Sequence, residues 1–87
     1  MMKGQIRMSK LEKIQVIECA ARAITIQNYS MGASIEMGLS LYCERAIEDG
    51  PFGKKILISR RQYDDLVKRT QDKVDTWRAL DKAFKKA

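Results

Sequence analysis

The amino-acid sequence predicts an all-α fold, in which an antiparallel helical hairpin is followed by a long C-terminal amphipathic helix. Apolar residues recur at steps of three and four in the stretches 9–29, 33–49 and 59–86, which is the spacing of a single helical face. Capping serines open the first and the last stretch. Residues that break helices gather only between the stretches, so the connections are expected near residues 29–33 and 50–58.

The first helix is predicted to begin after Ser9. In Ser9-Lys10-Leu11-Glu12 the serine and the glutamate occupy the positions of a capping box, in which each side chain accepts a hydrogen bond from the other residue's backbone N–H. Two apolar rows follow up to about Tyr29, and two rows indicate contact with neighbours on two sides of the helix. The principal row is Leu11, Ile14, Ile17, Ala21 and Ile24, and the second row is Val16, Ala20 and Ala23.

A turn is predicted at residues 28–32, where small polar residues and glycine cluster. The alternative at this point is one long helix that continues straight through. A second helix is predicted from Ala33 to Asp49, because Gly50 suits the left-handed position after a helix and Pro51 cannot continue one.

The predicted hairpin also has a predicted register. If its centre lies near Met31, residues equally far from the centre lie side by side, with Leu39 opposite Ala23 and Gly38 level with Ile24. Large side chains then face small ones, as close packing requires.

The C-terminal third contains the longest predicted helix. The sequence leaves open whether residues 54–58, just before it, form a short extended segment, which their branched apolar residues favour. The helix opens at Ser59 and runs to Lys86 without Gly or Pro. At about 1.5 Å per residue it is roughly 40 Å long, more than so small a domain needs. Its apolar stripe is Tyr63, Leu66, Val67, Thr70, Val74, Trp77, Leu80 and Phe84.

The composition limits the classes of function. The 87 residues include two Cys and no His, so the commonest general base and transition-metal ligand is missing. We expect no catalytic residues, no metal site and no cofactor, and therefore no enzyme. The hairpin register places Cys19 level with Cys43; we expect two buried, reduced thiols, and a redox bridge is the alternative.

Length and hydropathy indicate one helical domain, residues 9–87, preceded by a flexible N-terminal segment, residues 1–8. No apolar stretch reaches the ~20 residues that a membrane span needs, and we expect a cytoplasmic protein without membrane contact. A chain this short has a thin core and no metal or disulfide to stabilise it. A homo-oligomer, most simply a dimer, is therefore expected.

The net charge of +6 is distributed unevenly, with an acidic middle and basic flanks. Lys54, Lys55, Arg60 and Arg61 lie within eight residues that contain no acid. They flank the start of a helix, where free backbone N–H groups attract anions. We predict a solvent-exposed anion-binding patch at these four residues.

These features favour a small, basic, regulatory protein that binds nucleic acid through this basic loop. One alternative is a helical modulator, an inhibitor or adaptor, that binds another protein through the C-terminal helix. Another is an oligomer that binds a small phosphorylated ligand with the same loop. The contacts expected with a protein partner or a second subunit are Tyr63, Trp77, Leu80 and Phe84.

Overall fold

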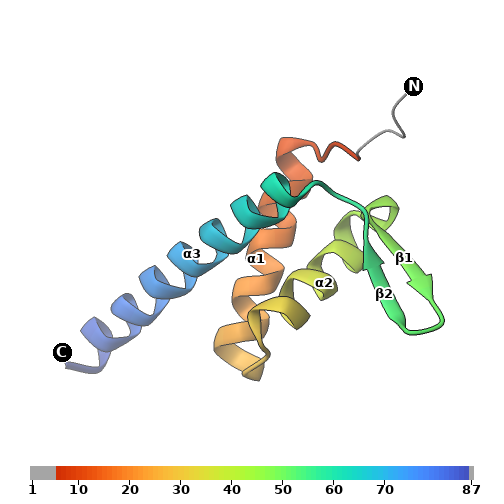
Figure 1. The fold of residues 1–87 in the computed structure, drawn as a ribbon. Coiled ribbons are helices and arrows are strands. Elements are labelled where there is room, and N and C mark those ends of the chain that lie inside the picture. Colours follow the sequence, from red (N-terminus) through yellow and green to blue (C-terminus); the bar gives the residue numbers. More distant parts are fainter. Residues whose placement is uncertain (1–5, 87) are drawn as a thin grey trace.

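The computed structural model describes residues 6–86, which form three α-helices and a small two-stranded β-sheet (Figure 1). The described chain is mostly helical, as predicted, but it is not all-α, because residues 47–56 form a β-hairpin. The elements in chain order are α1 (Lys10–Gln27), α2 (Met31–Tyr42), the short 3₁₀ helix η1 (Glu44–Ala46), β1 (Ile47–Gly50), β2 (Gly53–Ile56) and α3 (Arg60–Lys86).

Helix α1 begins at the predicted capping box. Ser9 Oγ accepts a hydrogen bond from the Glu12 N–H at 3.1 Å, and Glu12 Oε1 accepts one from the Ser9 N–H at 2.8 Å. The helix ends at Asn28, which adopts the left-handed conformation with a φ of 60°, one that Asn tolerates better than most residues. Ser30 then caps α2 by accepting a hydrogen bond from the Ala33 N–H at 3.2 Å. The predicted turn therefore separates two helices, and the alternative of one continuous helix is wrong.

Helices α1 and α2 approach each other closely at Gly38. A Cβ atom added there would lie 2.9 Å from the Val16 carbonyl oxygen and 3.0 Å from Val16 Cγ1, so only glycine fits without a shift. The predicted register, with Gly38 level with Ile24, is wrong by about two helical turns. Part of the difference arises because the connection between the helices, residues 28–30, is centred before Met31.

The segment predicted as the end of the second helix forms η1 and β1 instead. Helix α2 stops at Tyr42, well before the predicted end at Asp49. Strand β1 pairs with β2 in antiparallel fashion, with Ile47 opposite Ile56. A strand is stabilised by backbone hydrogen bonds to a later segment of the chain. The spacing of apolar residues, from which the helix was predicted, does not report such pairing. The sequence left the conformation of residues 54–58 open. In the structure β2 covers residues 53–56 and pairs with β1 of the same chain.

The core lies around α1, which α2 and α3 cover on two sides (Figure 1), in agreement with its two apolar rows. Two members of the predicted principal row, Leu11 and Ile14, are exposed instead. Ile6 and Met8 pack against the core, and residues 1–5 of the predicted N-terminal segment lie outside the described residues. The remaining buried members of the cluster are Val16, Ile17, Ala20, Ile35, Leu39, Cys43, Ala46, Ile58 and Leu66.

Arg45 ties the segment after α2 to the start of α1. Its Nη2 donates to Glu12 Oε1 at 2.7 Å and to the Arg7 carbonyl oxygen at 2.7 Å, and its Nη1 donates to Glu12 Oε2. The Arg45 guanidinium and then the Ser9 N–H lower the pKa of the Glu12 carboxyl from 4.5 to about 2. One side chain thus holds together two segments that are distant in the sequence, the start of α1 and the segment after α2.

The two cysteines do not meet. Cys43 is buried beside Glu12, and burial, followed by the Glu12 charge, raises the pKa of its thiol. Cys19 lies further along α1, is partly exposed and lines a shallow hollow with Met37. Both thiols are free. The prediction of a shared buried position is wrong, because Cys43 is buried beside Glu12 and Cys19 is partly exposed near Met37.

Helix α3 is longer than the body against which it packs. The described residues span 57 × 27 × 17 Å, and Figure 1 shows α3 diverging from α1, so that its C-terminal half projects away from α1 and α2. The fully buried side chains of α3 end at Val74. Within residues 6–86, no helix is both long and apolar enough to cross a membrane.

Candidate functional site

The four bases of the predicted patch are divided between two places. Lys54 lies on β2, where its Nζ contacts Asp49 Oδ1 on β1 at 2.7 Å, and this carboxylate raises the pKa of Lys54. Lys55 stands opposite Glu48 in the strand register. Both lysines are exposed, but each has an acid beside it or across the hairpin, which weakens their attraction for another anion.

The two arginines of the patch lie at the start of α3. At about 3.3 Å per residue in extended chain, Arg60 is up to about 20 Å along the chain from Lys54. Arg60 is 85% exposed and contacts Asp64 at 3.1 Å, whereas Arg61 is exposed and has no ion pair with another described residue. The structure therefore keeps the two arginines together and separates them from the two lysines.

A second group of bases lies between α1 and α3. Lys10 and Lys13 of α1, together with Ile14 and with Arg69 of α3, line a hollow of about 220 Å³ between the two helices. Arg69 also contacts Asp65 at 3.1 Å. Sequence reasoning missed these lysines because α1 and α3 are far apart in the chain. The second apolar row of α1 was the only signal that another helix covers it.

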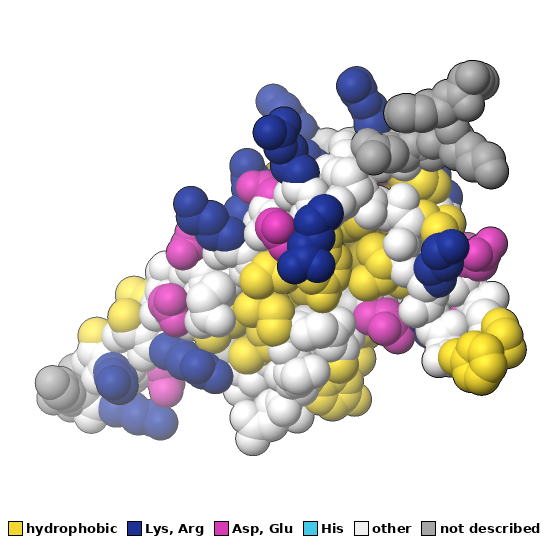
Figure 2. Space-filling model, in the orientation of Figure 1, with side chains coloured by type: hydrophobic (Ala, Val, Ile, Leu, Met, Phe, Trp, Pro, Cys, Tyr) yellow, Lys and Arg dark blue, Asp and Glu magenta, His cyan; other side chains and the backbone are white. Residues whose placement is uncertain are grey.

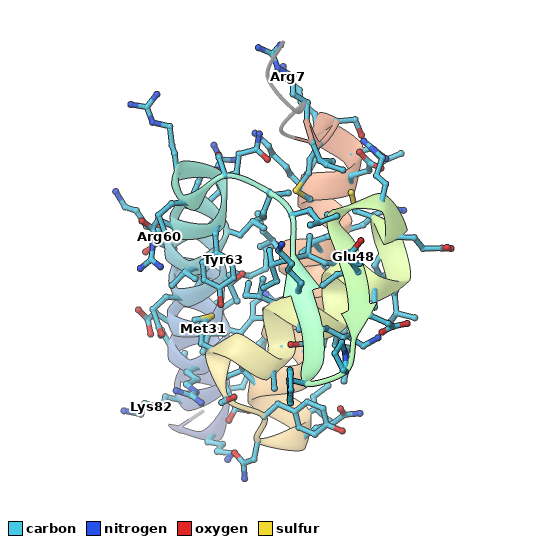
Figure 3. The ribbon with its side chains drawn as sticks, turned by 45° about the vertical axis from the view of Figure 1, so that its right-hand side comes forward. Arg7, Met31, Glu48, Arg60, Tyr63 and Lys82 are labelled. Carbon is cyan, nitrogen blue, oxygen red and sulfur yellow. The ribbon has the colours of Figure 1, made fainter. Side chains whose placement is uncertain are left out.

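The beginnings of α1 and α3 lie at the same end of the molecule (Figure 1). Figure 2 shows Lys and Arg side chains along the edge formed by α3 and the start of α1, with acidic side chains among them, and Figure 3 shows Arg7 and Arg60 pointing into solvent at this end. We call this surface the basic end. Its bases without an ion pair among residues 6–86 are Arg7, Lys10, Lys13, Arg61 and Lys68.

Tyr63 belongs to the body of the protein. It is partly buried and packs against the core, as Met31 does (Figure 3). With Ile56, Ile58 and Arg60 it lines an open hollow of about 390 Å³ between β2 and α3. Of the four predicted contact residues, Tyr63 is thus one of the two that are partly buried.

The other three predicted contacts lie on the projecting half of α3. Trp77 is partly buried, and Lys73 Nζ lies 5.6 Å from the centre of its ring, within the range of a cation–π contact. Leu80 is 53% exposed and Phe84 is 78% exposed. These three apolar residues form an apolar face, which we call the C-terminal stripe.

The described residues hold no cluster of three or more His, Cys, Asp or Glu side chains placed to bind a metal ion. The chain matches no known family model, no curated protein and no solved structure. Function must therefore be argued from the basic end and from the C-terminal stripe themselves.

Proposed function

We propose that this protein is a non-catalytic regulatory protein that binds nucleic acid through the basic end. The observation that supports this proposal is the convergence of two helix beginnings with unpaired bases from both helices, Lys10 and Lys13 on α1 and Arg61 and Lys68 on α3. The serine caps accept the N–H groups of Glu12 and Gln62. The other N–H groups at the two helix beginnings favour phosphate, and lysine and arginine add full charges around them.

The basic end suits a polyanion better than a single phosphate. Its bases lie on two helices and just before α1, and all but the partly buried Lys13 are exposed, whereas a site for a small phosphorylated ligand is usually concave and largely closed. Neutralising backbone phosphates releases counterions, and this sequence-independent term supplies most of the non-specific affinity. Lys54 and Lys55 are expected to contribute less, because Asp49 and Glu48 lie beside or across from them.

The experiment is a titration of a fluorescent duplex, a single strand and an RNA hairpin, read by anisotropy at several salt concentrations. Four phosphate contacts per subunit predict a log–log salt slope of about −3 to −4 on duplex DNA, and a dimer doubles it. The test variant replaces four unpaired bases of the basic end by glutamine, at Lys10, Lys13, Arg61 and Lys68. It should lose binding and flatten the salt dependence while unfolding at the same temperature, because none of the four is buried.

A matched control removes the same charge elsewhere, with glutamine at Arg22, Lys54, Lys55 and Lys82. If the control loses as much affinity as the test variant, net charge and not the basic end is responsible. If the wild-type protein shows no salt-sensitive binding to any of the three nucleic acids at low ionic strength, the proposal fails. Competition by inorganic phosphate at millimolar concentration would favour the small phosphorylated ligand instead.

A protein modulator is the second candidate, and the exposure of Leu80 and Phe84 favours it. Apolar side chains on a projecting helix are typical anchors for a partner. The homodimer that the short chain and thin core predict stays a prediction.

A further inference from the structure

Two exposed apolar side chains lie among the bases at the start of α1. Leu11 is 63% exposed and Ile14 is 56% exposed, and a separation of three residues makes them neighbours on one side of the helix. A single exposed leucine or isoleucine is ordinary on a protein surface. What distinguishes this pair is the charge around it, because Lys10 and Lys13 stand next to it in the same two turns.

Ile14 also lines the hollow of about 220 Å³ between α1 and α3, together with Lys10, Lys13 and Arg69. The two lysines have no ion pair with another residue among 6–86. Arg69 contacts Asp65 at 3.1 Å, so the charges at the hollow still sum to a positive value. The hollow thus offers an apolar wall with an excess of positive charge beside it.

We propose that the basic end binds single-stranded nucleic acid in preference to duplex, with an unstacked base against Leu11 and Ile14 and neighbouring phosphates on the bases around them. This inference rests on the proposed binding of nucleic acid and adds the class of strand. A single strand presents apolar base faces beside its phosphates, and proteins that bind it combine a positive groove with side chains that cover those faces. In a duplex the same faces are stacked inside the helix, out of reach of Leu11 and Ile14.

The size of the hollow favours one group of a longer molecule. Pockets that enclose a whole drug-sized ligand measure about 300–1,000 Å³, and this hollow, at about 220 Å³, is smaller. A base that belongs to a strand needs no such enclosure, because the phosphates on either side of it are held by separate charges.

The extent of the apolar surface argues against a lipid bilayer as the occupant. A helix that lies in a bilayer surface has a broad apolar face along its length. Here the face is limited to Leu11 and Ile14, since Glu18 lies one turn beyond Ile14 and contacts Arg22 at 3.0 Å. The hollow is also formed between two helices, which suits an inserted group better than a flat surface.

The first measurement uses the wild-type protein and three forms of one fluorescent oligonucleotide, read by anisotropy. The forms are the single strand, its duplex and a strand of equal length built from stable abasic residues, which keeps the phosphates and lacks the bases. The single strand should bind about 10-fold more tightly than either of the others. DNA and RNA versions of the single strand separate the two sources of this chemistry, and a preference for either version over its duplex supports the inference.

The second measurement removes the apolar contact. The double variant Leu11→Ser with Ile14→Ser should bind the single strand about 10-fold more weakly and bind the duplex and the abasic strand as the wild type does. Its log–log salt slope should stay unchanged, because an apolar contact releases no counterions. Both positions are exposed, and circular dichroism checks that the fold is kept.

A matched control changes the same two residue types elsewhere. Ile26 and Leu41 are 76% and 62% exposed, in the last turns of α1 and α2. The double variant Ile26→Ser with Leu41→Ser should leave all three affinities unchanged. If it weakens single-strand binding as much as the test variant does, the contact is not at Leu11 and Ile14 and the inference fails.

Failure of the inference can be told apart from failure of the proposed function. Binding to none of the oligonucleotides at low ionic strength would refute both. Duplex binding as tight as single-strand binding, or a Leu11 and Ile14 variant that loses nothing, would refute the single-strand preference and leave nucleic-acid binding in place. Sedimentation with vesicles of phosphatidylserine and phosphatidylcholine that depends on Leu11 and Ile14, with no preference for a single strand, would assign this surface to lipid instead.

Discussion

Gly38→Ala tests the close approach of α1 and α2. The added Cβ atom would lie 2.9 Å from the Val16 carbonyl oxygen, 3.0 Å from its Cγ1 and 3.2 Å from its Cα. Two of these three atoms belong to the backbone and cannot rotate away, so the helices must move apart by several tenths of an ångström. Overpacking of this kind typically costs about 1–3 kcal/mol.

The helix itself partly offsets this cost. Alanine is favoured over glycine in a helix interior by up to about 1 kcal/mol. We therefore expect Gly38→Ala to lower the free energy of unfolding by about 1–2 kcal/mol, which corresponds to about 5–10 °C in melting temperature for a domain of this size. Urea denaturation followed by circular dichroism measures the change, with the protein concentration held constant because association also stabilises the fold.

Two further variants make the test specific. At Gly32, in the first turn of α2, an added Cβ would meet only Tyr63 Oη, at 3.9 Å, so Gly32→Ala should be neutral or slightly stabilising. Combining Gly38→Ala with Val16→Ala should not restore stability, because the Val16 carbonyl oxygen and Cα remain. If Gly38→Ala is as stable as Gly32→Ala, the described contact between α1 and α2 is incorrect.

Two other predictions concern titratable groups. The Glu12 carboxyl has its pKa lowered from 4.5 to about 2 in the folded protein, so its contribution is fully present above about pH 4.5 and is lost as the pH falls towards 2. The unfolding free energies of wild-type protein and Glu12→Gln should therefore converge over this window, and a constant difference at every pH would contradict the Arg45 contact. A bulky maleimide should label Cys19 in the folded protein and Cys43, which is 2% exposed, only on unfolding; equal labelling rates would show that Cys43 is not buried.

Local signals in the sequence predicted the parts of the fold that depend on neighbouring residues. The capping box at Ser9 gave the correct start of α1, because both of its hydrogen bonds form within four residues. At Ser59 the predicted serine cap forms, since Ser59 Oγ accepts from the Gln62 N–H at 3.2 Å. The Gln62 side chain does not complete a capping box, because its Oε1 has no partner among the described residues. The start of α3 was nevertheless predicted within one residue.

Features that depend on distant residues were not predicted. Residues 44–49 fit a continued helix by spacing alone, yet Ile47, Glu48 and Asp49 pair with a later strand. Glu48 and Asp49 face Lys55 and Lys54 in that pairing, and such cross-strand pairs are invisible until the turn is recognised.

The candidate site shows the same limit. Arg60 and Arg61 were identified because they are adjacent in the sequence. The contact of Arg60 with Asp64 was not predicted, although the spacing of four residues in a helix places the two side chains together. Lys10 and Lys13 were missed because only the packing of α1 against α3 brings them to the same surface. The C-terminal stripe was found from spacing, since Leu80 and Phe84 follow the period of the helix beyond the residues that the body covers.

The length of α3 has a consequence for how order is distributed along it. An isolated helix as short as the projecting half is marginal in water, because starting a helix is costly while extending one is not. Here the packed first half, up to Val74, supplies the nucleus, and residues 75–86 extend it without a break. Amide hydrogens should thus exchange faster with each turn towards the C-terminus, and a molecule that covers Leu80 would slow exchange in turns it does not itself touch.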